Sequence, residues 1–241
     1  MNLLHFFLPQ TCCICGEITK NAFENKKIYF QGGKNRFESP FCENCTQRME
    51  KSFYKARRKI DGTDSTAVYL FGFSDETVER AIYHLKTQNC KACRAFFANA
   101  AGEVVEEMLA GKKTDLCLSY IPRSISLFDK FGFDQSEEVL RTFVRFYPST
   151  NLIRLFERDK RYKSPQKTLD KKQRLINAER SLKLLTCPSI PKSIIILDDM
   201  ITTGATASTA YKLLSGIGKG DVSFLFLAGT ENIEERRKNN E

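Results

Sequence analysis

The sequence lacks an apolar run long enough to span a bilayer. Residues Leu3 to Leu8 are apolar, but the chain lacks the basic start and the small-residue cleavage site that complete a secretory signal. We therefore expect a cytoplasmic protein without membrane insertion. In that compartment the 9 cysteines are not expected to form a disulfide scaffold, and their spacing points to metal instead.

The length and charge of the chain limit its domain organisation and its binding partners. A chain of 241 residues with 41% hydrophobic residues allows one large domain or a core domain with a small appendage. The formal net charge is +9, and much of the excess lies in residues 157–183, which hold ten Lys or Arg against four acids. This block is a solvated surface, a binding site for polyanions, or a lid over a neighbouring crevice.

Residues 194–206 are the most informative stretch. The four aliphatic residues 194–197 predict a strand buried on both faces, as in a parallel sheet. Asp198 and Asp199 follow, then a loop of small residues and a helical pattern that stops at Gly216. The loop lacks both the Gly-Lys-Ser/Thr ending of a Walker A loop and the Gly-x-Gly-x-x-Gly of dinucleotide sites.

A loop of small residues that enters a helix can direct several backbone N–H groups at one anion, and the helix dipole adds to the attraction. The hydroxyls of Thr202, Thr203 and Thr206 add donors. The two carboxylates just upstream can accept hydrogen bonds from sugar hydroxyls or hold a hydrated cation. The stretch therefore predicts a ribose 5-phosphate site; the alternative is a solvated acidic turn before an ordinary helix cap.

The same stretch resembles the phosphoribosyl pyrophosphate (PRPP) binding motif of type I phosphoribosyltransferases, in which a hydrophobic strand, two acids and two hydrophobic residues precede a Thr-Gly loop that ends in Thr. The resemblance implies an α/β fold with a parallel sheet flanked by helices, and PRPP with Mg²⁺ as ligands. Asp198 and Asp199 would contact the ribose hydroxyls. The 5-phosphate would lie within the loop formed by Thr202, Thr203, Gly204, Ala205 and Thr206.

Two Cys-x-x-Cys pairs, Cys12/Cys15 and Cys42/Cys45, can supply the four thiolates of a tetrahedral zinc site. Four thiolates leave no open position for a catalytic water, so this zinc would be structural. It would carry the folding of a segment too short to bury a core. The alternative is four unligated cysteines.

We place a zinc-ribbon-like domain at residues 1–62 and the main domain at residues 63–241. A hairpin turn is expected at Gly32–Gly33, between the two cysteine pairs. Residues 46–66 are polar and basic, and we expect them to form a helix end and a linker.

A third pair, Cys90 and Cys93, has the same spacing, but no fourth pair is available to complete a second site. We interpret its members as unligated thiols, with a metal or redox role left open. Cys13 is ambiguous because adjacent cysteines can exchange roles.

Strand and helix patterns alternate through the main domain. Strands are expected at 67–73, 115–123, 152–156 and 222–229, with a helix capped by Ser74 and another over about 95–109. The strand at 115–123 runs into a Pro-Arg turn, and because the carboxyl ends of strands line the crevice of an α/β sheet, Arg123 is positioned for an anion. In type I phosphoribosyltransferases the corresponding loop holds pyrophosphate, so the resemblance gives that role to Arg123.

Nearly the whole chain resembles the ComF family of competence-associated proteins. The shared elements are a leucine-rich start running into Pro9, both cysteine pairs, Tyr69 to Lys86, Ile121-Pro122, Gly132-Phe133-x-Gln135, Gln166 with Arg174-x-x-Asn177, and Asp198 to Thr206. Members are described as a zinc ribbon on a type I phosphoribosyltransferase domain, linked to handling incoming single-stranded DNA in natural transformation.

Three positions depart from the related patterns. Phe131 stands where the ComF pattern has Arg, and Asp134 where it has Asn. Thr202 stands where purine-salvage transferases carry an Asp as general base, so that role is not transferred.

Two functions compete. The first is a phosphoribosyltransferase that binds PRPP and Mg²⁺, with catalytic residues and acceptor unknown. The second is a single-stranded DNA-binding module or interaction scaffold with an inactive transferase site, working with DNA-uptake proteins. The two are compatible.

Overall fold

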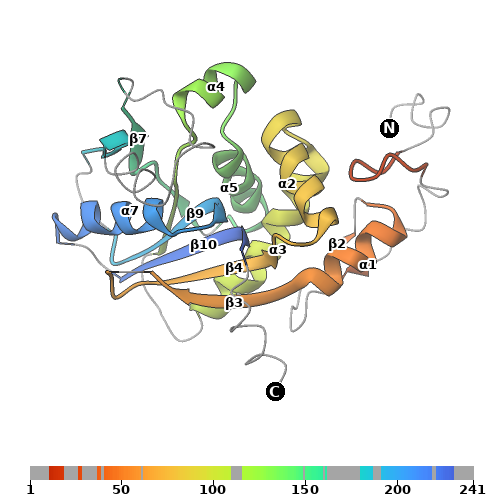
Figure 1. The fold of residues 1–241 in the computed structure, drawn as a ribbon. Coiled ribbons are helices and arrows are strands. Elements are labelled where there is room, and N and C mark those ends of the chain that lie inside the picture. Colours follow the sequence, from red (N-terminus) through yellow and green to blue (C-terminus); the bar gives the residue numbers. More distant parts are fainter. Residues whose placement is uncertain are drawn as a thin grey trace.

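A six-stranded sheet lies at the centre of the computed structural model, with strand order β3-β4-β10-β9-β5-β6 (Figure 1). The structure describes residues 11–18, 27–28, 37–38, 41–60, 62–109, 116–148, 150–159, 161, 180–186, 191–218 and 221–230. The sheet consists of β3 (Phe53–Lys59), β4 (Thr66–Gly72), β5 (Leu116–Tyr120), β6 (Asn151–Leu152), β9 (Ser193–Ile201) and β10 (Asp221–Gly229). Neighbouring strands are parallel except for β3 and β4. The predicted α/β class is confirmed.

Helices cover this sheet, and two short antiparallel strand pairs lie outside it. The helices are α1 (Glu43–Ser52), α2 (Glu76–Gln88), α3 (Lys91–Leu109), α4 (Ile125–Phe131), α5 (Gln135–Phe146) and α7 (Ala205–Ser215). The pairs are β1 (Lys27–Ile28) with β2 (Phe37–Glu38) and β7 (Phe156–Arg158) with β8 (Leu182–Leu184). Pairing of β1 with β2 fits the expected hairpin, whose turn at 32–33 lies outside the described residues. None of the described helices has the length and apolar character to cross a membrane.

Alternate residues of β9 pack into two cores on opposite faces of the sheet. Ile195 and Leu197 belong to the core that includes α2, α3 and α5, whereas Ile194 and Ile196 belong to the core that includes α7. All four side chains are at most 4% exposed. The strand is therefore buried on both faces, as predicted, because a parallel sheet needs helices on both sides.

Residues 53–59 form an edge strand where the sequence predicts a linker. Phe53 and Ala56 are buried, whereas Arg57 and Lys59 are exposed, so the segment looks polar although it pairs along β4. Charged side chains are common on edge strands because they discourage pairing with other chains. The main sheet thus includes residues on both sides of position 62.

Three other boundaries differ from expectation. Asp75, and not Ser74, is the N-cap of α2, because its carboxylate accepts hydrogen bonds from the backbone N–H groups of Thr77 and Val78. The next helix begins at Lys91, directly after Cys90. The strand expected over 152–156 is divided between β6 and β7.

Candidate functional site

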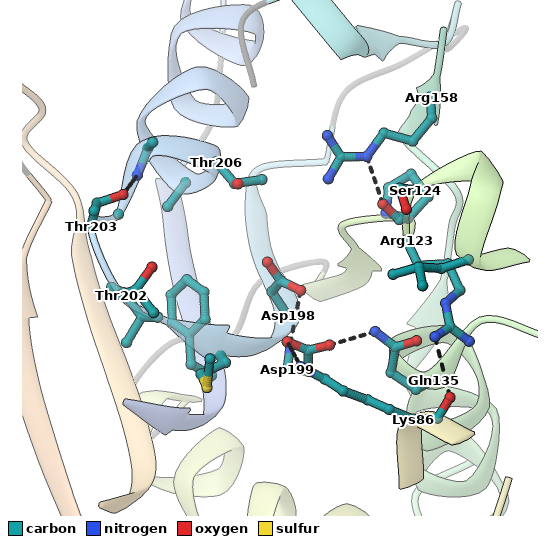
Figure 2. Close-up of a pocket in the computed structure, with 18 of the residues that line it drawn as sticks. Lys86, Arg123, Ser124, Gln135, Arg158, Asp198, Asp199, Thr202, Thr203 and Thr206 are labelled. Atoms are coloured by element: carbon teal, nitrogen blue, oxygen red, sulfur yellow. Dashed lines mark hydrogen bonds and ion pairs between the residues drawn. The ribbon is translucent and has the colours of Figure 1, made fainter. Parts of the chain in front are cut away.

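A cavity of about 400 Å³ opens at the carboxyl ends of the parallel strands β5 and β9 (Figure 2). Every residue predicted for the PRPP site lines it: Arg123, Asp198, Asp199, Thr202, Thr203, Gly204, Ala205 and Thr206. Lys86, Gln135 and Arg158 line it as well. The topology therefore brings the predicted residues into one crevice, which is where α/β sheets bind ligands.

The predicted phosphate loop, Thr202–Thr206, leads from the end of β9 into the first turn of α7. Gly204 is the N-cap of α7 with φ +75°, a left-handed conformation that glycine adopts without strain. The hydroxyl of Thr203 accepts a bond of 3.4 Å from the backbone N–H of Ala205, and the guanidinium of Arg58 donates to the carbonyl of Thr202 at 2.8 Å. Since the first N–H groups of a helix have no partner within it, the loop can donate to an anion.

The two acids at the end of β9 have different surroundings. Asp199 accepts a hydrogen bond from the Gln135 amide and forms an ion pair of 3.0 Å with Lys86. Asp198 accepts from the backbone N–H of Asp199 at 2.8 Å, and no ion pair to its carboxylate is present within the described part of the chain. Burial, followed by the charge of Asp199, raises the pKa of Asp198 to about 8. Of the two acids, Asp198 is therefore the one whose carboxylate has no Lys, Arg or His of the described residues within 4.0 Å.

Arg123 lines the pocket, but its guanidinium is already engaged. It donates to the carbonyl of Phe133 at 2.9 Å and to that of Lys86 at 3.2 Å, and it lies 5.0 Å from the ring centroid of Phe131. Phe131 thus packs against Arg123 by a cation–π contact. Direct pyrophosphate binding by Arg123 stays a prediction.

Arg158 is a pocket residue that the sequence analysis missed. Figure 2 shows its guanidinium extending toward Thr206. It donates from Nε to the carbonyl of Pro122 at 2.8 Å and from Nη1 to the hydroxyl of Ser181 at 2.9 Å. Burial lowers the pKa of Arg158, an effect that the charge of Asp198 opposes. Its only sequence signal is its place at the end of a short strand, which the surrounding basic segment obscures.

Asp134, at the position where the ComF pattern has Asn, has a structural role in this protein. Its Oδ1 accepts from the backbone N–H groups of Ser136 and Glu137 at the start of α5. Its Oδ2 accepts from the backbone N–H of Arg123 at 2.6 Å. The residue therefore caps a helix and fixes the Pro-Arg turn, and it does not line the pocket.

Lys86 and Gln135 entered the sequence analysis only as parts of the family resemblance, without a site role. They come from α2 and α5 and meet at Asp199. Gln166, Arg174 and Asn177 lie outside the described residues, as does most of the basic segment, so its role as a lid stays a prediction.

The four cysteines predicted to bind zinc converge. The sulfurs of Cys12, Cys15, Cys42 and Cys45 all lie within 4.8 Å of one another, and the Cys15 and Cys42 sulfurs are 3.6 Å apart. A tetrahedral zinc ion with bonds of about 2.3 Å would separate its sulfurs by about 3.8 Å. The donor set and its spacing therefore fit a structural zinc ion. Gly16, with a left-handed φ of +78°, follows the first pair directly.

Cys90 and Cys93, interpreted from the sequence as unligated thiols with a metal or redox role left open, have a third cysteine beside them. Cys13 lies with them, and the three sulfurs are within 4.8 Å of one another. Spacing could not reveal this group, because Cys13 is separated from the pair by more than 70 positions in the chain.

Comparison with known proteins gives structural likenesses at low identity. No protein-family model matches the chain, and no curated protein matches it. Solved structures similar to it include adenine phosphoribosyltransferase from Saccharomyces cerevisiae, at 14% identity over 81% of this chain and 94% of that one, with a TM-score of 0.40. The enzyme of the same name from Thermoanaerobacter pseudethanolicus is 15% identical over 80% and 92%, with a TM-score of 0.39. The purine phosphoribosyltransferase from Pyrococcus horikoshii is 14% identical over 68% and 88%, with a TM-score of 0.31.

Proposed function

We propose that this protein binds PRPP with Mg²⁺ in the pocket at the end of β9. It would be a cytoplasmic phosphoribosyltransferase-domain protein of the ComF type, with a zinc-stabilised unit at residues 1–62 and the transferase-like domain at 63–241. Its role would be in DNA uptake during natural transformation.

The order of charges across the pocket is the observation that carries the proposal. Donors of the phosphate loop lie on one side, the carboxylates of Asp198 and Asp199 lie in the middle, and the cationic side chains lie on the other side (Figure 2). PRPP has the same order of groups: a 5-phosphate, a ribose diol and a pyrophosphate. Carboxylates suit hydroxyl donors, whereas N–H groups, Lys and Arg suit phosphates.

Magnesium fits this pocket in the way that it usually binds beside phosphates. It keeps several waters and takes one or two carboxylates together with substrate oxygens. Asp198 and Asp199 would contribute through ribose hydroxyls or water, and the ion would neutralise pyrophosphate charge. The chain's own cations, Lys86 and Arg158, would stabilise pyrophosphate as the leaving group when an acceptor attacks C1.

Calorimetric titration with PRPP and Mg²⁺ tests the proposal. The variant D198N/D199N should lose at least about 100-fold in affinity, since each hydrogen bond to a charged group is worth about 1.5–3 kcal/mol. Asp64→Asn is the matched control, because Asp64 is an exposed acid at the amino ends of the parallel strands, whereas the pocket lies at their carboxyl ends. Absence of PRPP binding to folded, zinc-loaded wild type would contradict the proposal.

A screen for released pyrophosphate with candidate acceptor bases and amines distinguishes an enzyme from a binding protein. Release that needs both an acceptor and the two acids would establish the transferase. PRPP binding without release for any acceptor would favour a regulatory PRPP site.

The alternative, single-stranded DNA binding, is favoured by the net charge of +9 and by the basic segment 157–183. Binding through phosphate contacts should weaken steeply with salt. A titration of labelled single strands at two salt concentrations, with and without PRPP, measures it. Absent or salt-independent binding would remove this alternative.

A further inference from the structure

A second cluster of thiols lies beside the first. It consists of Cys13, Cys90 and Cys93, whose sulfurs are all within 4.8 Å of one another. The Cys13 and Cys93 sulfurs are 3.7 Å apart. Cys93 is fully buried, and the other two are half-buried against the core that includes α2 and α3.

The pair Cys90/Cys93 has the same local geometry as Cys42/Cys45. The carbonyl of Cys42 accepts from the backbone N–H of Thr46 at 2.9 Å at the start of α1. The carbonyl of Cys90 accepts from the N–H of Arg94 at 3.0 Å at the start of α3. In both pairs the first cysteine precedes a helix and the second lies in its first turn, which directs two sulfurs to one point.

Cys12 and Cys13 are divided between the two clusters. The backbone of this loop sends Cys12 to the four-sulfur group and Cys13 to the three-sulfur group. Adjacent cysteines that serve two separate groups account for the Cys-Cys sequence, which a single zinc site does not require.

We propose that Cys13, Cys90 and Cys93 bind a second thiophilic divalent metal ion, with Zn²⁺ as the expected species. The distance of 3.7 Å between two of the sulfurs matches the separation of about 3.8 Å expected around tetrahedral zinc. Sulfurs that only fill space in a core have no need to face one another. No histidine or acid of the described chain joins the three sulfurs within 4.8 Å, so a fourth position is available to a solvent molecule or small anion.

This second ion would fasten the N-terminal segment to the helix end that lines the pocket. Lys86, four residues before Cys90, pairs with Asp199, and its carbonyl accepts from Arg123. Cys13 belongs to the segment around the first cluster, whereas Cys90 lies in the turn between α2 and α3 and Cys93 in the first turn of α3. The metal would therefore join the cysteine-rich unit to the side of the crevice that holds Lys86.

Metal content of the full chain, purified from zinc-replete cells under reducing conditions, tests the proposal directly. Elemental analysis should give two Zn²⁺ per wild-type chain and one per chain of Cys13→Ser. Cys117→Ala removes a buried cysteine outside both clusters, and this control should keep two. One Zn²⁺ per folded wild-type chain overturns the proposal without any variant.

Cobalt substitution identifies the ligands. After exchange to Co²⁺, the thiolate charge-transfer absorbance of Cys13→Ser should fall to about four sevenths of the wild-type value, and that of Cys90→Ser should fall as far, because loss of one ligand releases the ion. Unchanged absorbance in both variants, or a disulfide among these three cysteines in freshly purified protein, overturns the proposal.

Discussion

Two short loops, Cys12–Gly16 and Thr202–Thr206, contain a glycine at nearly the same left-handed φ, +78° at Gly16 and +75° at Gly204. The contacts that hold the two loops in place differ. The predicted phosphate loop is anchored by β9, by α7 and by Arg58. The cysteine loop is anchored by the Thr11–Ile18 bridge, by hydrogen bonds within the loop and by sulfurs that face other sulfurs. The fold therefore holds the first loop in place, whereas we expect the second to depend on a metal ion bound by its cysteines.

The sharpest test of this difference is removal of the metal from the first cluster by Cys45→Ser. Structural zinc contributes roughly 10–16 kcal/mol to the folding of small zinc peptides, so residues 11–18 and 41–52 should lose most of their protection from hydrogen exchange. Strand β9 and helix α7 should keep theirs, because two apolar cores hold them. Native protection of residues 11–18 in a metal-free variant would show that packing alone holds the cysteine loop.

On the pocket side, Asp134→Ala should lower the stability of the fold. This change removes the cap of α5 and leaves the buried N–H of Arg123 without its acceptor, for a combined loss of about 2–4 kcal/mol in the free energy of unfolding. Asp134→Asn should still lose about 1–3 kcal/mol, because its amide oxygen can cap the helix but its NH2 group cannot accept from the N–H of Arg123. Chemical denaturation compares the variants; equal losses for Ala and Asn would mean that the cap of α5 contributes nothing measurable to stability.

The two loops also differ in how far sequence could predict them. Asp198 to Thr206 are contiguous in the sequence. Because they lie between a buried strand and a helix, the local pattern is enough to place them at the carboxyl end of a sheet strand. Arg58, Lys86 and Arg158 reach the same edge from β3, α2 and β7. These elements meet because of the order of the strands in the sheet, and no short stretch of sequence predicts that order.

Edge strand β3 was missed for a related reason. Its pairing with β4 is a property of the backbone, whereas its sequence shows mainly the charges that an exposed edge tolerates. Four of the cysteines could be grouped from the sequence, because two Cys-x-x-Cys pairs have the spacing typical of a zinc site. Cys13 could not be grouped, since its partners come from the distant junction between α2 and α3.

The acids of the pocket should make stability depend on pH. The pKa of Asp198 is raised to about 8, so the folded state holds a proton that an unfolded carboxyl releases near pH 4. Stability should therefore fall as pH rises between about 4 and 8, by at most about 1.4 kcal/mol per pH unit. Asp198→Asn should flatten this slope, whereas Asp64→Asn should not. Denaturant midpoints measured from pH 5 to pH 9 test this prediction. Parallel pH profiles for wild type and Asp198→Asn would contradict a raised pKa at Asp198.

The smallest expected effect compares the two loops most directly, through Gly16→Ala and Gly204→Ala. A methyl group at either position meets no atom within 4 Å, so the cost is that of a left-handed backbone, about 1–2 kcal/mol in both. The two substitutions should affect different binding properties. Gly16→Ala should weaken zinc retention against a chelator and leave PRPP affinity within about twofold. Gly204→Ala should lower PRPP affinity by about tenfold and leave zinc retention unchanged, because the strained residue begins the helix whose N–H groups would face the 5-phosphate. If either substitution changed both readouts equally, the two loops would be coupled, as expected only if the cysteine-rich unit controls the pocket.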